Sequence, residues 1–177
     1  MRHRNFTLAI LTMLMLARLA SPSATRALPQ QKDYLSDEEA DKIRDALTPA
    51  ERIRLYLLFA EDRLKKFDYD LNRSTPERRR AEVLNNLMNG YVGCVDDGAD
   101  QIAMAREKQM DIHAELKLMR TKYQAFLDQL EKYDKDGPEL DTYRDTLEDA
   151  IEGTKDALSD VDEASKEMLP APVRRKQ

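Results

Sequence analysis

The chain of 177 residues contains one cysteine, two histidines, five glycines and no tryptophan. A single cysteine excludes a disulfide within the chain, and two histidines leave few ligands for a transition metal. Aromatic residues make up only 6% of the chain, which disfavours a β-sandwich or β-barrel built from aromatic and β-branched runs. Charged residues make up 36%. This balance is typical of amphipathic helices.

The first 27 residues have the layout of a secretory signal peptide. Arg2, His3 and Arg4 precede an apolar stretch over residues 6–17, and small residues follow. The apolar stretch is shorter than the roughly 20 residues that cross a bilayer, so a cleaved leader is favoured over the alternative, a membrane anchor. We expect cleavage after Ser23 or Ala27 and an exported protein, periplasmic or extracellular, whose membrane contact is peripheral at most.

Negative charge dominates the chain that remains after this segment. The leader holds four arginines and no acidic residue, which leaves 25 basic and 34 acidic residues in 28–177. An acidic surface repels phosphate backbones, so we expect no nucleic-acid partner. Residues 169–177 end in Arg174, Arg175 and Lys176 and are expected to form a flexible basic tail.

Helix-start signals divide residues 28–168 into segments of one helical domain. Two capping-box patterns pair Ser36 with Glu39 and Thr48 with Glu51. Three prolines stand where a helix can begin, at Pro49, Pro76 and Pro138. Between these signals, apolar residues recur in alternating steps of four and three over 49–71, 76–134 and 139–168. That spacing places them on one seam of each helix. The sequence predicts an all-α fold of elongated antiparallel helices with coiled-coil-like seams.

The long segment 76–134 admits two interpretations. Its register never breaks, which favours one continuous central helix flanked by helices 49–71 and 139–168. Gly90, Gly93 and Gly98 weaken its middle, because each glycine costs about 0.5–1 kcal/mol against alanine in a helix. A break near 93–98 would instead give a four-helix up-down bundle. We expect the continuous helix.

Few residues are candidates for chemistry. His113 lacks a second histidine and the glutamate three residues before it that a di-iron bundle uses. Asp134, Asp136 and Asp141 flank Gly137, but Lys132 and Tyr143 occupy the first and last liganding positions of an EF-hand loop. We therefore expect no cofactor, no resident metal and no catalytic residue. If there is a metal site, it is a loose one at the three aspartates or at His113.

Cys94 is the only thiol in residues 28–177. It can form a disulfide with a second chain, remain a free thiol, or serve as a small packing residue on a helix.

These observations favour an exported, non-enzymatic helical protein that mediates protein–protein interaction as a scaffold, adaptor or chaperone-like element. Narrow helical seams offer faces for a partner's apolar segment and little room for a pocket. We expect the partner to be a second copy, in a homodimer, or another envelope protein. The alternative is a ligand- or metal-binding helical bundle that uses Cys94, His113 or the turn at Asp134.

Overall fold

The computed structural model describes residues 34–73 and 79–167, which form five α-helices and one short 3₁₀-helix and confirm the all-α fold. The chain divides into two units, Met1–Gln31 and Lys32–Gln177, and all described residues belong to the second. The expected signal peptide and basic tail lie outside the described residues. The elements are α2 (Asp37–Asp45), α3 (Pro49–Leu71), α4 (Arg80–Glu107), α5 (His113–Asp136), η1 (Leu140–Thr142) and α6 (Arg144–Glu167).

Side-chain caps begin the first two helices, as the sequence predicted. The Ser36 hydroxyl accepts the backbone N–H of Glu39, and the Glu39 carboxylate accepts the N–H of Ser36. Thr48 and Glu51 make the same reciprocal pair at the start of α3, with Pro49 at its first position. These bonds satisfy N–H groups that have no partner inside the helix.

The continuous helix predicted over 76–134 is wrong, and so is the alternative break near 93–98. Helix α4 runs through residues 93–98 to Glu107, and the chain turns at 108–112 before α5 begins. Gln109 adopts a left-handed conformation with φ 52°, and its N–H donates to the Arg106 carbonyl at 3.0 Å. The Met110 N–H donates to the Ala105 carbonyl at 2.9 Å. This is a Schellman stop with glutamine where glycine is usual.

The last helix also begins later than predicted. Glu139 is left-handed with φ 54°, and residues 140–142 form the turn η1 before α6 starts at Arg144. The left-handed residue directly after Pro138 interrupts the helical path that the pattern over 139–168 predicted.

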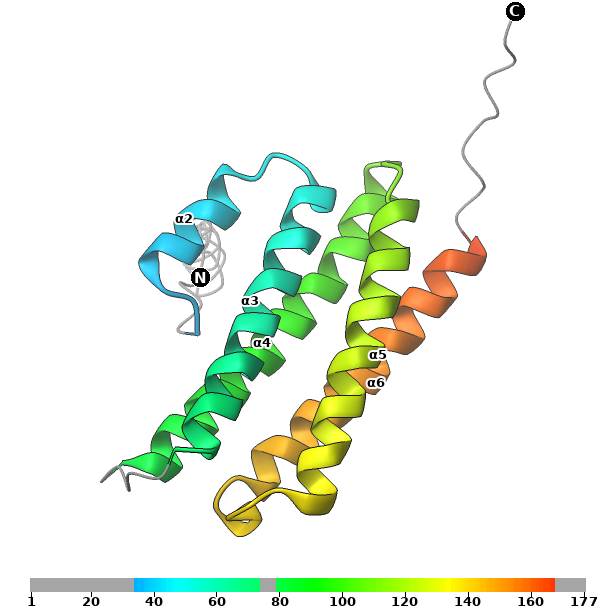
Figure 1. Ribbon diagram of the computed structural model, residues 1–177. Coiled ribbons are helices and arrows are strands. Elements are labelled where there is room, and N and C mark those ends of the chain that lie inside the picture. The colour runs from blue at the N-terminus through cyan, green and yellow to red at the C-terminus, as the bar shows by residue number, and fades with distance from the viewer. Residues whose placement is uncertain (1–33, 74–78, 168–177) are drawn as a thin grey trace, which may run out of the picture. The chain divides into compact units, whose positions relative to one another are not determined.

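Helices α3 to α6 form two helical hairpins that lie side by side (Figure 1). The hairpin α3–α4 places α3 next to α5 and α4 next to α6. Four polar contacts between the hairpins join residues 61 positions apart, so the paired helices run in the same direction. These four contacts are Arg54–Glu115, Glu61–Lys122, Asn85–Thr146 and Arg106–Glu167.

The predicted apolar stripes are buried between the hairpins. On α3, the residues at the predicted four-and-three spacing from Ile53 to Leu71 are all buried. The corresponding positions of the segment 76–134 that the structure describes are buried too, except Gln109, which lies in the turn between α4 and α5. On α6 the buried positions are shifted, because Ala150, Ala157 and Ala164 face the core while Ile151 and Leu158 lie half-buried at its edge. Small alanines let α6 pack closely on its neighbours.

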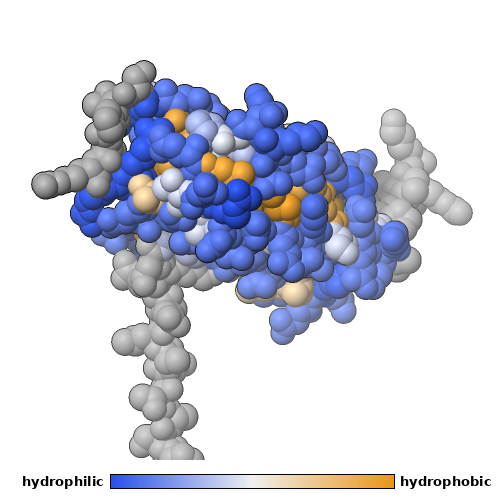
Figure 2. Space-filling model, turned by 90° about the horizontal axis from the view of Figure 1, so that it is seen from below, coloured by the Kyte–Doolittle hydropathy of each residue, from blue (hydrophilic) through white to orange (hydrophobic). Residues whose placement is uncertain are grey.

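Seen from the end that carries the 136–144 turn, the described surface is mostly hydrophilic, with apolar side chains confined to small areas (Figure 2). Four large hydrophobic side chains are exposed in the described part of the chain: Leu47, Leu58, Tyr69 and Leu118. None of the described helices is long and apolar enough to span a membrane.

Candidate functional site

A short N-terminal segment lies against the outer edge of the α3–α4 hairpin, on the side away from α5 and α6 (Figure 1). We call residues 34–46 the strap; they comprise Tyr34, Leu35, Ser36, helix α2 and Ala46. No residue of α2 is buried, so the strap adds little to the hydrophobic core. Its attachment must therefore come from specific contacts with α3 and α4.

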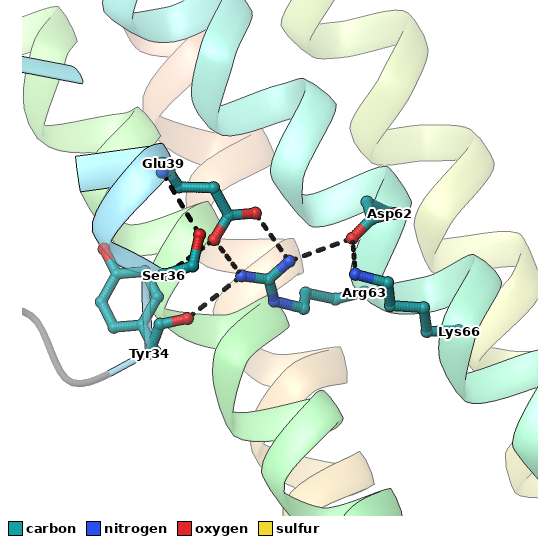
Figure 3. Close-up of polar contacts among 6 residues, drawn as sticks. All are labelled: Tyr34, Ser36, Glu39, Asp62, Arg63 and Lys66. Atoms are coloured by element: carbon teal, nitrogen blue, oxygen red, sulfur yellow. Dashed lines mark hydrogen bonds and ion pairs between the residues drawn. The ribbon is translucent and has the colours of Figure 1, made fainter. Parts of the chain in front are cut away.

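Arg63 on α3 makes the principal contact with the strap (Figure 3). Its guanidinium donates to both carboxylate oxygens of Glu39, from Nη1 at 2.9 Å and from Nη2 at 2.5 Å. Nη2 also donates to the Tyr34 carbonyl at 3.1 Å. The side chains of Arg63 and Glu39 are only 10% and 14% exposed. Two parallel charge-assisted bonds away from water make this a strong and directional contact.

The Glu39 carboxylate serves two purposes at once. It caps α2 through the backbone of Ser36 and neutralises the buried guanidinium of Arg63. Burial alone raises the pKa of Glu39, but the hydrogen bonds and charge of Arg63, with the Ser36 N–H, outweigh burial and hold the pKa below its usual value. The hydrogen bond to Glu39 raises the pKa of Arg63. Both groups are therefore charged at neutral pH.

Two glycines on α4, Gly90 and Gly93, leave room for the Arg63 side chain and the Tyr34 ring. A methyl group at Gly93 would lie 2.7 Å from the Tyr34 ring, so the ring sits directly on the α4 backbone. A methyl group at Gly90 would lie 3.3 Å from Nε of Arg63. The glycines that the sequence suggested as a weak point in the helix thus form a notch for a ring and a guanidinium. We call Arg63, Gly90 and Gly93 the strap site.

The edge around the strap site is polar although it is buried. Of the five buried polar or charged residues in the described part of the chain, Arg63, Asp97 and Gln101 lie on this hairpin away from its apolar stripes. Asp97 and Gln101 share a face of α4 with Gly90 and Cys94, because their spacing of four, three and four follows the helical turn. Asp97 and Gln101 are 8% and 6% exposed, and the Gln101 amide donates to the Asp97 carbonyl at 3.2 Å, so this face of α4 is polar inside the protein.

Cys94 lies on α4 next to Gly93 and is 1% exposed. Its thiol is buried, and the chain contains no second cysteine for a disulfide. A disulfide to a second chain would first require the surrounding structure to open, because the sulfur has almost no contact with solvent.

The predicted metal candidates do not come together. His113 begins α5, whereas Asp134 and Asp136 end it, about 30 Å away along the helix. His113 Nδ1 lies 2.7 Å from the Asp111 carboxylate, and Asp141 accepts from Arg144 at 3.1 Å. Within residues 34–73 and 79–167, no three histidine, cysteine or acidic side chains are placed to share a metal ion.

Two surface hollows of the described part of the chain lie away from the strap site and are open to solvent. One runs along α6 between Lys155 and Glu167, and the other lies between α5 and α6 near Asp134 and Glu152. Charged side chains line most of both hollows, which is unlike the apolar enclosed pockets that bind small molecules.

Sequence reasoning missed Tyr34 and Arg63, because neither stands in a motif and the two meet only after folding. The one available signal was the pair Gly90 and Gly93 inside a helical pattern, which often marks a close approach. No family model, curated protein or solved structure matches the chain.

Proposed function

We propose that the protein is an exported, non-enzymatic interaction protein, a scaffold or adaptor whose strap site binds a helical segment of another protein. The observation that supports this most is the way the strap is held. An aromatic ring sits on Gly93 and a helix-capping carboxylate pairs with Arg63, while no residue of α2 is fully buried in the apolar core. A peptide from another chain can supply both groups, so the site does not depend on covalent attachment of the strap.

The strap itself indicates what a partner segment should contain. Tyr34 is followed after two residues by the N-cap Ser36 and after five by Glu39. A partner would therefore present an aromatic residue just before a helix, a serine or threonine cap, and a glutamate in its first turn. Such a segment brings a negative charge and a capped helix N-terminus to Arg63, which is the polar counterpart of helix-in-groove binding.

The chain's own strap competes with a partner. A covalently attached segment has an effective concentration of about a millimolar or more, so a free segment displaces it only at high affinity or high concentration. The strap therefore raises the affinity or the concentration that a partner segment needs in order to bind.

Peptide binding to a variant with a released strap tests this proposal. In the full chain carrying Glu39→Arg, residues 39 and 63 are both positive and repel. A fluorescent peptide with the sequence of residues 32–47 should bind this variant with a Kd on the order of 10–100 µM in an anisotropy titration. The wild-type protein, whose site is filled, should bind it at least about tenfold more weakly.

The matched control is the same peptide with Tyr34→Ala and Glu39→Gln, which keeps the helix but removes the ring and the charge. Its affinity should fall about tenfold or more, because the bidentate pair and the ring contact are both lost. Equal binding of the two peptides, or no saturable binding to the Glu39→Arg variant with unchanged helicity by circular dichroism, would contradict the proposal.

A further inference from the structure

We propose that the strap of one copy occupies the strap site of a second copy, so that two chains exchange residues 34–46 and form a symmetric dimer. This inference rests on the proposed function and names its partner as another copy of the chain. The site holds a segment of this chain, and every copy carries the same segment.

The link between strap and bundle permits the exchange. Only Ala46, Leu47 and Thr48 separate α2 from α3, and Leu47 is 86% exposed. Ala46 and Thr48 have extended backbones, with ψ angles of 117° and 151°. The peptide group between Ala46 and Leu47 is bound to the start of α3, because the Leu47 N–H donates to the Glu51 carboxylate at 2.8 Å and Arg52 Nε donates to the Ala46 carbonyl at 3.2 Å. Rotation about the backbone of Ala46 moves the strap away and leaves these bonds and the Thr48 cap of α3 in place. Short hinges of this kind favour exchange of a terminal element.

The four-helix core does not depend on which strap covers it. Side chains of α3 to α6 form the buried apolar cluster, and Tyr34, Leu35 and Ile43 of the strap only pack against its margin. An open chain therefore keeps its bundle while the strap site is uncovered. In that uncovered site Arg63 keeps its contact with the neighbouring Asp62 carboxylate at 3.1 Å but loses the bidentate pair with Glu39, which is unfavourable until another carboxylate takes that place.

Contacts in the exchanged dimer are the same as those within one chain. The Arg63–Glu39 pair, the bond from Arg63 to the Tyr34 carbonyl and the ring on Gly93 all form again between copies. Each copy gives one strap and receives one, so a two-fold axis closes the assembly at two chains. The dimer loses only the entropy of association, which concentration offsets.

A charge-exchange experiment distinguishes strap binding within a chain from binding between chains. One full-length variant carries Glu39→Arg and the other carries Arg63→Glu, so each repels its own strap. In a mixture, the Glu39 strap of the second variant meets the Arg63 site of the first. Light scattering behind size exclusion should show each variant alone as a monomer and an equimolar mixture, at tens of micromolar, with twice the monomer mass.

The double variant carrying Glu39→Arg and Arg63→Glu in one chain is the matched control. It restores an opposite-charge pair, and its strap should regain protection from hydrogen exchange. Circular dichroism of each single variant alone checks that it keeps its helices. A mixture that stays monomeric while the double variant is restored overturns the exchange. Dimers of either single variant alone would overturn it as well. The peptide titration above is independent, so strap-site binding without mixed dimers refutes only the identity of the partner.

Discussion

Individual side chains decide how tightly the strap is held. Gly93 has no side chain, and the Tyr34 ring occupies the space that one would fill. The buried guanidinium of Arg63 pairs with two carboxylates, bidentately with Glu39 of the strap and at 3.1 Å with the neighbouring Asp62. At each of these positions a small chemical change removes one contact and leaves the four-helix core intact, so the strap and the bundle can be perturbed separately.

Alanine substitutions at Gly93 and Gly153 test whether Gly93 differs from an ordinary position in a helix. Gly153→Ala should raise the free energy of unfolding by about 0.5–1 kcal/mol, because its new methyl group would lie no closer than 3.7 Å to a neighbour. Gly93→Ala brings the same helical gain to α4 but pushes the Tyr34 ring away from 2.7 Å. Hydrogen exchange should then show faster exchange in residues 34–46 for Gly93→Ala alone. If Gly93→Ala left hydrogen exchange in residues 34–46 unchanged, the close packing of the Tyr34 ring on Gly93 would be contradicted.

Residue roles were the least accessible from the sequence. Gly90 and Gly93 lie in an otherwise good helical pattern, and sequence alone assigns them only a cost in helix stability. The role of Gly93 depends on Tyr34, nearly 60 residues earlier, and the role of Gly90 depends on Arg63 of α3. No periodicity carries that information.

The turn between α4 and α5 governs the arrangement of the elements. It ends α4 at Glu107, and Ile112, which is fully buried, anchors the chain before α5 begins. The Asp111 carboxylate accepts the His113 N–H at 3.0 Å and helps to start the next helix. The left-handed Gln109 is the strained position of this turn.

Replacing that residue tests the turn directly. Gln109→Gly should raise the free energy of unfolding by about 1 kcal/mol in urea titrations, because glycine adopts positive φ without the penalty paid by a side chain. Gln109→Val should lower it, since a β-branched residue fits the left-handed region worst. If the residues instead formed a continuous helix, the order would reverse and glycine would destabilise.

At the scale of the helices, the sequence predicted those helix starts that carry a recognisable capping box. The starts of α2 and α3 follow from Ser36 and Thr48, each with a glutamate three residues on. The stop at residue 107 was missed because glutamine stands where glycine is expected and the apolar register continues across the turn, from Ala105 to Ile112. Buried apolar residues at 105 and 112 are compatible with either a helix or a turn between them, so the apolar pattern alone could not distinguish the two.

At the scale of the whole described unit, the strap and the bundle differ in how they are held. The bundle has a shared apolar core, whereas the strap is attached by the polar contacts of Arg63, the Tyr34 ring on Gly93 and a few apolar side chains at the core's margin. Elements with little buried apolar surface open at lower free energy than the core. The parallel stacking of the two hairpins follows from contacts distant in sequence, and the apolar pattern of the helices did not predict it.

Acid should therefore release the strap before it unfolds the bundle. The pKa of Glu39 is held below its usual value, so its contribution is complete above the unfolded pKa of about 4.3 and is lost as the pH falls through the lower folded pKa. Amide NMR signals of residues 34–46 should shift below about pH 4 while those of α4 and α6 remain. Glu39→Gln should remove this transition, and a simultaneous change of strap and core signals would contradict it.

The position of Cys94 allows openings of the bundle to be timed. The thiol is 1% exposed, belongs to the apolar core of the four helices and is the only cysteine in the chain. A thiol-specific reagent can reach it only when the helices around it separate, so the labelling rate measures how often the core of the bundle opens. Labelling of Cys94 and hydrogen exchange in residues 34–46 therefore report on two different motions, opening of the bundle and release of the strap, without an engineered probe.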